Sequence, residues 1–168
     1  GGNTGAPFAN DFVEIYNPSN ATVALSGLSI QYGSSAGTTW VVTPLPAAAS
    51  IAPGKSFLVR LGSGGAVGAA LPTPDATGST NMSATNGKVA LVDGTNALTQ
   101  ACPTALIIDL IGYGTANCSE TDEAPAGTNT TGQSRGMGGC ADTDNNSADF
   151  TVGTPVPRNS ATVAAPCT

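Results

Sequence analysis

Asn10-Asp-Phe-Val-Glu-Ile-Tyr-Asn-Pro-Ser19 is the stretch from which the fold of this chain is predicted. Its middle is rich in residues that favour strands, and the Asn-Pro pair at its end cannot continue a strand. We therefore expect a β-strand over residues 11–16. Glu14 lies in the middle of this strand, so its carboxylate either faces solvent or is neutralised by a partner from a distant part of the chain.

The composition favours a protein built from short strands and turns. Gly (22 residues) and Pro (12 residues) are abundant in the 168-residue chain, whereas long helix formers are scarce. Such a composition is typical of all-β proteins with many turns and irregular loops. We expect an all-β fold organised as a single domain over residues 1–168, which is long enough for a sizeable core.

The charge and hydropathy patterns exclude two classes of partner. The chain has only 5 Lys and Arg residues, no His and a net charge of −6. It lacks the basic surface that binds phosphate backbones, so we expect no direct nucleic-acid partner. No apolar run approaches the roughly 20 residues that cross a bilayer, so we expect no membrane span.

Alternation and short apolar runs predict further strands. These strands cover residues 25–32, 40–42, 57–61, 88–92 and 105–114, and a short last strand ends at residue 152. Residues 25–32 alternate, which predicts one buried and one exposed face. Residues 105–114 form the most apolar run, which predicts a central strand covered on both faces with Asp109 as a second misplaced acid.

The remaining segments are expected to be irregular, and no segment predicts a helix. Residues 62–84 have no periodicity and are interpreted as a packed structural loop in preference to a binding loop. Residues 120–139 are polar and are expected to form another loop.

Four cysteines, at positions 102, 118, 140 and 167, predict an oxidising compartment. None of them forms a Cys-x-x-Cys pair and no His is present, so the spacing of a zinc site is absent. An even number of cysteines in such a chain indicates two disulfides. Three pairings are open; we favour the sequential one, Cys102 with Cys118 and Cys140 with Cys167.

The polar cluster formed by Asp142, Asp144, Asn146 and Asp149 has two interpretations. Alternate oxygen ligands on a tight loop suit Ca²⁺, so these four residues are candidate calcium ligands. The cluster is not an EF-hand, because Ser147 stands where that motif needs Gly. Asx residues also build turns by bonding their own backbone, and this scaffold role is preferred.

Arg135 is the candidate partner of Glu14. The hypothesis is motivated by two acids, Glu14 and Asp109, inside apolar strands and by one Arg in an otherwise uncharged loop. We expect a partly buried structural ion pair in which Arg135 contacts Glu14, with Asp109 nearby.

The sequence offers little catalytic chemistry. Without His, neither a Ser-His-Asp nor a Cys-His arrangement can form, and the cysteines are expected in disulfides. The acids are scattered, and no dinucleotide-binding or P-loop motif is present. We expect no catalytic residues and no cofactor apart from the calcium considered above.

Several segments together resemble the lamin-tail domain. They are Asn-Asp-Phe-Val-Glu-Ile-Tyr-Asn (10–17), Leu-Ser-Gly-Leu-Ser-Ile (25–30), Ile-Ala-Pro-Gly-Lys-Ser-Phe-Leu-Val (51–59) and Asp-Leu-Ile-Gly-Tyr-Gly (109–114). The endings at 134–135, 142–150 and 155–159 are similar to the bacterial secreted branch of that family. The resemblance implies an immunoglobulin-like β-sandwich that is exported, and that occurs either alone or appended to secreted nucleases and phosphoesterases.

One departure from the family concerns the start of the chain. Family members begin with a strand just before the Gly-Gly-Asn segment, whereas this sequence starts at Gly1, an interior or processed start. If that strand is missing, the sandwich has an open edge that would accept a strand from another chain. The alternative is that the strand has been trimmed.

These observations favour a non-catalytic structural, adhesion or tethering module at the cell surface or in the extracellular medium. It would bind a protein partner or self-associate through the open edge, as a surface assembly or filament. The alternative is an accessory domain of a secreted nuclease or phosphoesterase.

Overall fold

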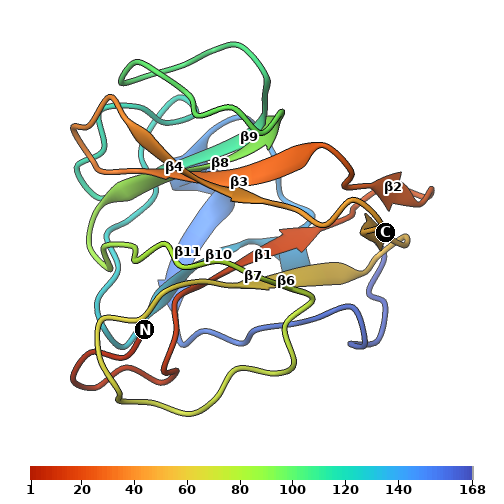
Figure 1. Ribbon diagram of the computed structural model, residues 1–168, viewed down its shortest axis with the longest axis horizontal. Helices are drawn as coiled ribbons and strands as arrows, with labels where there is room; N and C mark the ends of the chain where they lie inside the picture. Colours follow the sequence, from red (N-terminus) through yellow and green to blue (C-terminus); the bar gives the residue numbers. More distant parts are fainter. Residues whose placement is uncertain (168) are drawn as a thin grey trace.

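The chain folds into an immunoglobulin-like β-sandwich, seen in a computed structural model that describes residues 1–167. The first sheet is antiparallel and has the order β4-β3-β8-β9 (Figure 1). Its strands are β4 (Trp40–Pro44), β3 (Leu28–Gly33), β8 (Gly87–Asp93) and β9 (Ile107–Tyr113).

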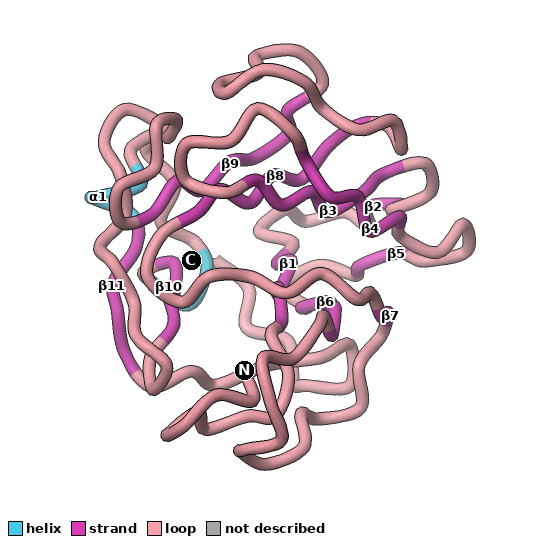
Figure 2. Tube along the Cα trace, turned by 60° about the vertical axis from the view of Figure 1, so that its left-hand side comes forward, coloured by secondary structure: helices cyan, strands magenta, loops and turns pink. Residues whose placement is uncertain are grey.

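The second layer consists of two separate pieces. One is a three-stranded sheet with the order β1-β6-β7, and the other is a hairpin of β10 and β11. Figure 2 shows the hairpin beside β1 on the same side of the first sheet. The bounds are β1 Phe12–Tyr16, β6 Ser56–Arg60, β7 Ala76–Thr77, β10 Gly132–Arg135 and β11 Phe150–Gly153. A further short pair joins β2 (Val23–Ala24) to β5 (Ser50–Ile51).

The core lies between the two layers and confirms the inward face predicted for residues 57–61. Phe57, Val59 and Leu61 are buried in the main apolar cluster, whereas Arg60 is exposed. Full burial of a side chain such as Leu61 contributes about 1.5–3 kcal/mol. This strand therefore anchors the second layer.

Strand β3 confirms one predicted face and corrects the other. Leu28, Ile30 and Tyr32 pack in the main core. The opposite face was expected to be exposed, but Ser29 and Gln31 are completely buried. The loop that follows β8 covers them. The Gln31 side chain donates from Nε2 to the Asn96 carbonyl, and its Oε1 accepts a hydrogen bond from the Leu98 backbone amide.

Strand β9 corrects the prediction of a central strand. It lies at the end of the four-stranded sheet, and Ile108 on it is 53% exposed. The strand is also shorter than predicted, because Leu106 adopts a positive φ of 65° that ends extended structure. An apolar run therefore did not distinguish an edge strand from a central one.

The segments expected to be irregular contain regular elements. Strand β10 falls within residues 120–139, and β7 falls within 62–84, where the buried Ala76 supports the interpretation of a packed segment. Two short helical turns, η1 (Met137–Gly139) and α1 (Asn146–Asp149), correct the expectation of none. Within residues 1–167, no helix is long and apolar enough to cross a membrane.

The C-terminal segment runs back across β1 and β6. The Lys55 side chain donates to the Thr162 carbonyl, and the Ala165 amide donates to the Gly54 carbonyl. Gly54 has a φ of 65°, as the third residue of a type II turn over residues 52–55 requires, and the Lys55 amide closes this turn by donating to the Ala52 carbonyl. The disulfide between Cys140 and Cys167 completes the attachment.

Candidate functional site

Strand β1 has one paired edge and one unpaired edge. The Asn17 amide donates to the Lys55 carbonyl, and the Leu61 amide donates to the Asp11 carbonyl. These bonds fix the odd-numbered residues of β1 as those paired with β6. The N–H and C=O groups of Phe12, Glu14 and Tyr16 therefore point the other way. Among residues 1–167 these groups have no backbone or side-chain partner.

Strand β10 presents a second unpaired edge towards the same space. The Gly136 amide donates to the Asp149 carbonyl, so the alternate residues Gly132, Ser134 and Gly136 pair with β11. The backbone groups of Gln133 and Arg135 point away from β11. Within the described part of the chain, no partner for them is present.

A cavity of about 730 Å³ lies between these two edges. Every residue of β1 and every residue of β10 lines it, and its floor comes from the first sheet. The apolar floor side chains are Ile30, Val89, Leu91 and Ile111. We call the space between β1 and β10 above this floor the strand slot.

The burial of β1 shows the effect of the strand slot. All five residues of β1 are only half-buried, although Val13 and Ile15 point into the core. Four of the five residues of the neighbouring strand β6 are buried. Since both strands belong to one sheet of a sandwich, the difference arises from the open side of β1.

Glu14 is held by Arg158, and the prediction that its partner is Arg135 is wrong. The Arg158 Nη2 and Nε atoms lie 2.6 Å and 2.7 Å from Glu14 Oε1, and the Arg158 backbone amide donates to Oε2 at 2.8 Å. The Ser56 hydroxyl also donates to this carboxylate. Two arginines were available in the last third of the sequence, and the chain path brings the later one to β1.

Arg158 also spans the outer side of the strand slot. Its Nη1 donates to the carbonyl of Gly138, which lies just beyond β10, and its guanidinium group stacks 5.4 Å from the Tyr16 ring centre. One side chain thus connects the β1 side to the β10 side. This bridge fixes the two edges relative to each other.

Arg135 forms a separate ion-pair cluster with three carboxylates. Its Nη2 donates to both oxygens of Asp109, at 2.7 Å and 2.9 Å, and its Nη1 donates to Asp142 at 3.0 Å. Asp149 lies 3.6 Å from Nη1. Burial raises the pKa of Asp109, and the nearby Arg135 opposes that shift. The structure therefore brings Arg135 and Asp109 together, as expected, but without Glu14.

The side chains of three candidate calcium ligands, Asp142, Asn146 and Asp149, are engaged by other groups of the protein. Both oxygens of Asp149 accept hydrogen bonds from Thr143, at 2.8 Å from its amide and 2.9 Å from its hydroxyl. Asp142 is occupied by Arg135. Asp144 has a positive φ of 55°, and its backbone carbonyl accepts from Thr121. Within residues 1–167, no group of three or more His, Cys, Asp or Glu side chains is arranged to hold a metal ion.

The same loop has the geometry of a turn scaffold. The Asn145 side chain caps α1 by accepting from the amides of Ser147 and Ala148. Burial would raise the pKa of Asp149, but hydrogen bonds from Thr143 and Asn145, together with Arg135, outweigh it and lower the pKa. The acid is thus held ionised inside the loop.

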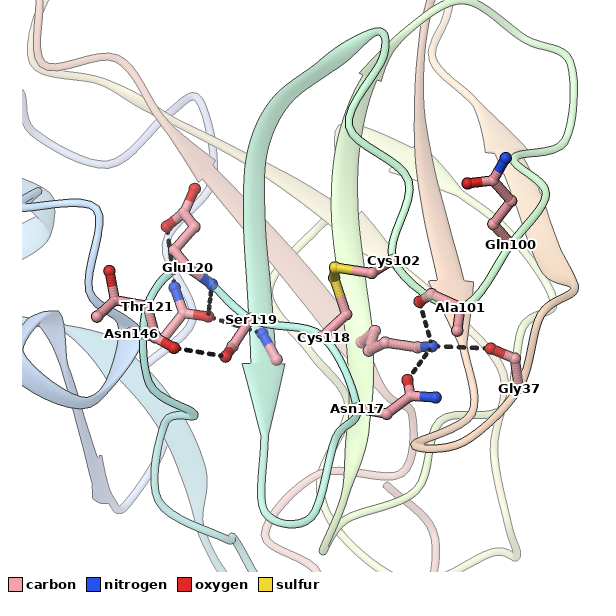
Figure 3. Close-up of a disulfide and its surroundings, with 12 residues drawn as sticks. Gly37, Gln100, Ala101, Cys102, Asn117, Cys118, Ser119, Glu120, Thr121 and Asn146 are labelled. Atoms are coloured by element: carbon pink, nitrogen blue, oxygen red, sulfur yellow. Dashed lines mark hydrogen bonds between the residues drawn. A yellow bond between two sulfur atoms is a disulfide. The ribbon is translucent and has the colours of Figure 1, made fainter.

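Asn146 connects this loop to β9. It is completely buried; its Oδ1 accepts from the Gly112 amide at 2.8 Å, and its Nδ2 donates to the Leu110 carbonyl at 2.9 Å. Figure 3 shows the Asn146 side chain beside Glu120, whose Oε2 accepts its second Nδ2 hydrogen bond at 2.9 Å. Burial raises the pKa of Glu120. Asn146 therefore takes the place of a neighbouring strand along part of β9.

Lys88 is a buried cation that the sequence did not reveal. Its side chain has no exposed area, and its Nζ donates to Gly37 O, Ala101 O and Asn117 Oδ1 at 2.7–2.8 Å. Two of these acceptors, Ala101 and Asn117, directly precede the disulfide-bonded Cys102 and Cys118 (Figure 3). Burial lowers the pKa of Lys88. One ammonium group thus joins three loops at this end of the first sheet.

The comparison with family models identifies the fold family. Residues 1–115, which include β1 to β9, match the Lamin Tail Domain model. No curated protein and no solved structure shows significant similarity to the chain. The strands β10 and β11, and Arg158, lie outside the matched residues. Lamin tail domains are immunoglobulin-like β modules, typically without catalytic activity, and this chain belongs to the lamin tail domain family.

Proposed function

We propose that the chain is a non-catalytic extracellular tethering module that holds a protein partner by β-strand addition to β1. The observation that carries this proposal is the unpaired edge of β1, whose three N–H and three C=O groups are directed into the strand slot. Exposed strand edges bind extended segments through backbone hydrogen bonds. Residues 1–168 would act as one unit, because the C-terminal disulfide ties the last segment to the body.

The two disulfides support an extracellular location. Proteins with such bonds are typical of oxidising compartments. The resemblance of residues 134–159 to the bacterial secreted branch suggests export from a bacterium. The acidic net charge of −6 argues against a nucleic-acid partner.

Tethering is favoured over self-assembly of folded copies. A second folded copy would have to bring a whole sheet edge to β1, and β10 and Arg158 stand on the far side of the slot. A single extended segment meets no such obstacle. We expect a monomer by light scattering over a wide concentration range, whereas growth into polymers would instead indicate a surface filament.

A peptide-binding experiment tests the proposal. The probe is a fluorescein-labelled peptide with alternating Val and Thr, measured by fluorescence anisotropy. Phe12→Pro removes an outward N–H group of β1 without removing a hydrogen bond to β6, so binding should weaken about tenfold. The matched variant Phe12→Val keeps that group and should bind as the parent chain does. Equal binding by all three proteins would contradict strand addition at β1.

A further inference from the structure

We infer that the disulfide between Cys102 and Cys118 is a reversible thiol-exchange site. Cys102 reacts with small thiols and small disulfides from solvent, and Lys88 is the positioning residue that keeps the two cysteines together when the bond between them is reduced. This inference goes beyond the proposed function, because it concerns the loops around Lys88 and is independent of the edge of β1 (Figure 3).

The two cysteines differ in their access to solvent. Cys118 is 4% exposed and packs in the second apolar cluster, with Trp40 and Val92, on the face of the first sheet opposite the main core. Cys102 is an exposed residue of the loop between β8 and β9. Thiol–disulfide exchange requires that the attacking thiolate reach a sulfur atom. A thiolate from solvent therefore attacks Cys102.

The exchange conserves atoms and electrons in both directions. An external thiolate bonds to Cys102 Sγ, the bond between the two sulfurs breaks, and its electron pair goes to Cys118 Sγ. The product is a mixed disulfide at Cys102 and a thiolate at Cys118. In the reverse direction, the Cys118 thiolate attacks Cys102 Sγ and the external thiolate leaves. Complete oxidation of the two thiols thus consumes one small disulfide and releases two small thiols.

The loop that carries Cys102 is held on the first sheet without help from the disulfide. Side chains of the sheet form hydrogen bonds of 2.6–3.1 Å with alternate residues of this loop. They join Ser29 to Gly94, Gln31 to Asn96 and Leu98, and Trp40 to Gln100. Because Ser29, Gln31 and Trp40 are themselves buried, these bonds persist when the two sulfurs separate.

Lys88 fixes the residues that directly precede the two cysteines. Its Nζ donates to Ala101 O at 2.7 Å and to Asn117 Oδ1 at 2.8 Å. The third hydrogen bond goes to Gly37 O, so all three donors of the ammonium group are used. Since the Lys88 side chain has no exposed area, a loop that moved away would leave a buried N–H group unpaired. Lys88 therefore keeps both cysteines within reach of each other.

Two variants with one cysteine of the pair test which sulfur reacts. Cys118→Ser and Cys102→Ser are incubated with oxidised glutathione, and the mixed disulfide is quantified by mass spectrometry after acid quenching. Cys102 in the first variant should react about tenfold faster than Cys118 in the second, because reactivity follows exposure. Equal rates, or no reaction at Cys102, would overturn its assignment as the reacting cysteine.

Equilibration in glutathione buffers tests the role of Lys88. The ratio of disulfide to dithiol gives the effective concentration of each cysteine pair, and the pair of Cys140 and Cys167 serves as a control in the same sample. Lys88→Met should lower the effective concentration of the Cys102 and Cys118 pair about tenfold, and that of the control pair less than about twofold. A merely destabilised fold would not single out one pair.

Variants of Asn117 test the same contact from the other side. Asn117→Asp places a carboxylate against the ammonium group and should raise the effective concentration of the Cys102 and Cys118 pair about threefold. The matched variant Thr115→Ala, at an exposed residue of the same loop, should leave it unchanged. Because Asn117 is exposed, its variants give the answer even if Lys88→Met does not fold. An effective concentration equal to that of the parent chain in the Asn117 variant would overturn the positioning role.

Hydrogen exchange of one amide shows whether the loop remains docked after reduction. In Cys102→Ser, the Leu98 amide should still exchange slowly, because its acceptor is the buried Gln31 side chain. Fast exchange of this amide would mean that the disulfide, and not the side chains of the sheet, holds the loop in place. The inference would then be overturned, since the reduced cysteines would separate.

Discussion

Replacing Glu14 by Gln is expected to lower the free energy of unfolding by about 2–3 kcal/mol, because the substitution breaks the ion pair with Arg158. Glu14 Oε1 lies 2.6 Å from Nη2 and 2.7 Å from Nε, and Oε2 accepts the Arg158 backbone amide. Hydrogen bonds to charged groups contribute about 1.5–3 kcal/mol each, and breaking a fully buried pair costs about 3–5 kcal/mol. The Glu14 side chain is 16% exposed and the Arg158 side chain is 29% exposed, so the expected loss of stability is smaller than for a fully buried pair.

A double-mutant cycle isolates the pair. The variants Glu14→Gln and Arg158→Gln should show a coupling energy of about 2 kcal/mol. The control cycle combines Glu14→Gln with Arg135→Gln, because Arg135 forms no ion pair with Glu14. Its coupling energy should be about 0.5 kcal/mol or less. Urea unfolding can be followed by the fluorescence of Trp40, the single tryptophan, which is 5% exposed.

Thermal unfolding provides a second readout of the same pair. A loss of about 2–3 kcal/mol corresponds to a fall in Tm of about 4–12 °C in a chain of this size. The reasoning is refuted if Glu14 couples more strongly to Arg135 than to Arg158, or if Glu14→Gln unfolds like the parent chain.

Three further substitutions test the polar networks and the C-terminal attachment. Asp149→Asn should lower the free energy of unfolding by about 2–3 kcal/mol, because it weakens the hydrogen bonds that the carboxylate accepts from Thr143. Asp144→Asn should change the free energy of unfolding by about 0.5 kcal/mol or less. The pKa of Asp149 in the folded chain lies below its ordinary value of 3.8, so its stabilisation is present above pH 3.8 and is lost as the pH falls through the folded pKa. A difference in urea midpoint between the parent chain and Asp149→Asn that stays constant into acid would contradict this. Lys88→Met should lower the free energy of unfolding by about 1.5–3 kcal/mol, since three partly buried hydrogen bonds lose their ammonium donor. Near-parental urea unfolding would show that water replaces it. Replacing both Cys140 and Cys167 by Ser should lower the free energy of unfolding by about 3.5 kcal/mol. An unchanged Tm would mean that the C-terminal segment is held without the disulfide.

Local sequence signals predicted the strands well. Residues 11–16 and 57–61 form strands because their side chains alternate and turn residues bound them, and both properties are local. The resemblance identified the sandwich, and the favoured cysteine pairing is the one in the structure. Strand β10 was missed, because its residues Gly-Gln-Ser-Arg have little strand propensity and are ordered by pairing with β11.

Long-range partners could not be predicted in the same way. Glu14 was correctly seen as a carboxylate that needs a partner, but the sequence did not distinguish Arg135 from Arg158, since the choice depends on how the last 30 residues return to β1. Lys88 was predicted only as part of the strand over residues 88–92, yet its ammonium group donates hydrogen bonds to three loops. Asn146 was interpreted as a calcium ligand or a turn residue, whereas its side-chain amide forms hydrogen bonds with the backbone of β9.

Amide hydrogen exchange at single-residue resolution tests the central claim, the unpaired slot between β1 and β10, most directly. The account predicts alternation along one strand: the amides of Val13 and Ile15, paired with β6, exchange slowly, and those of Phe12, Glu14 and Tyr16 exchange much faster. Addition of the alternating Val and Thr peptide should protect only the fast set. Uniform slow exchange along β1 without peptide would contradict the account, because the outward edge would then already be paired.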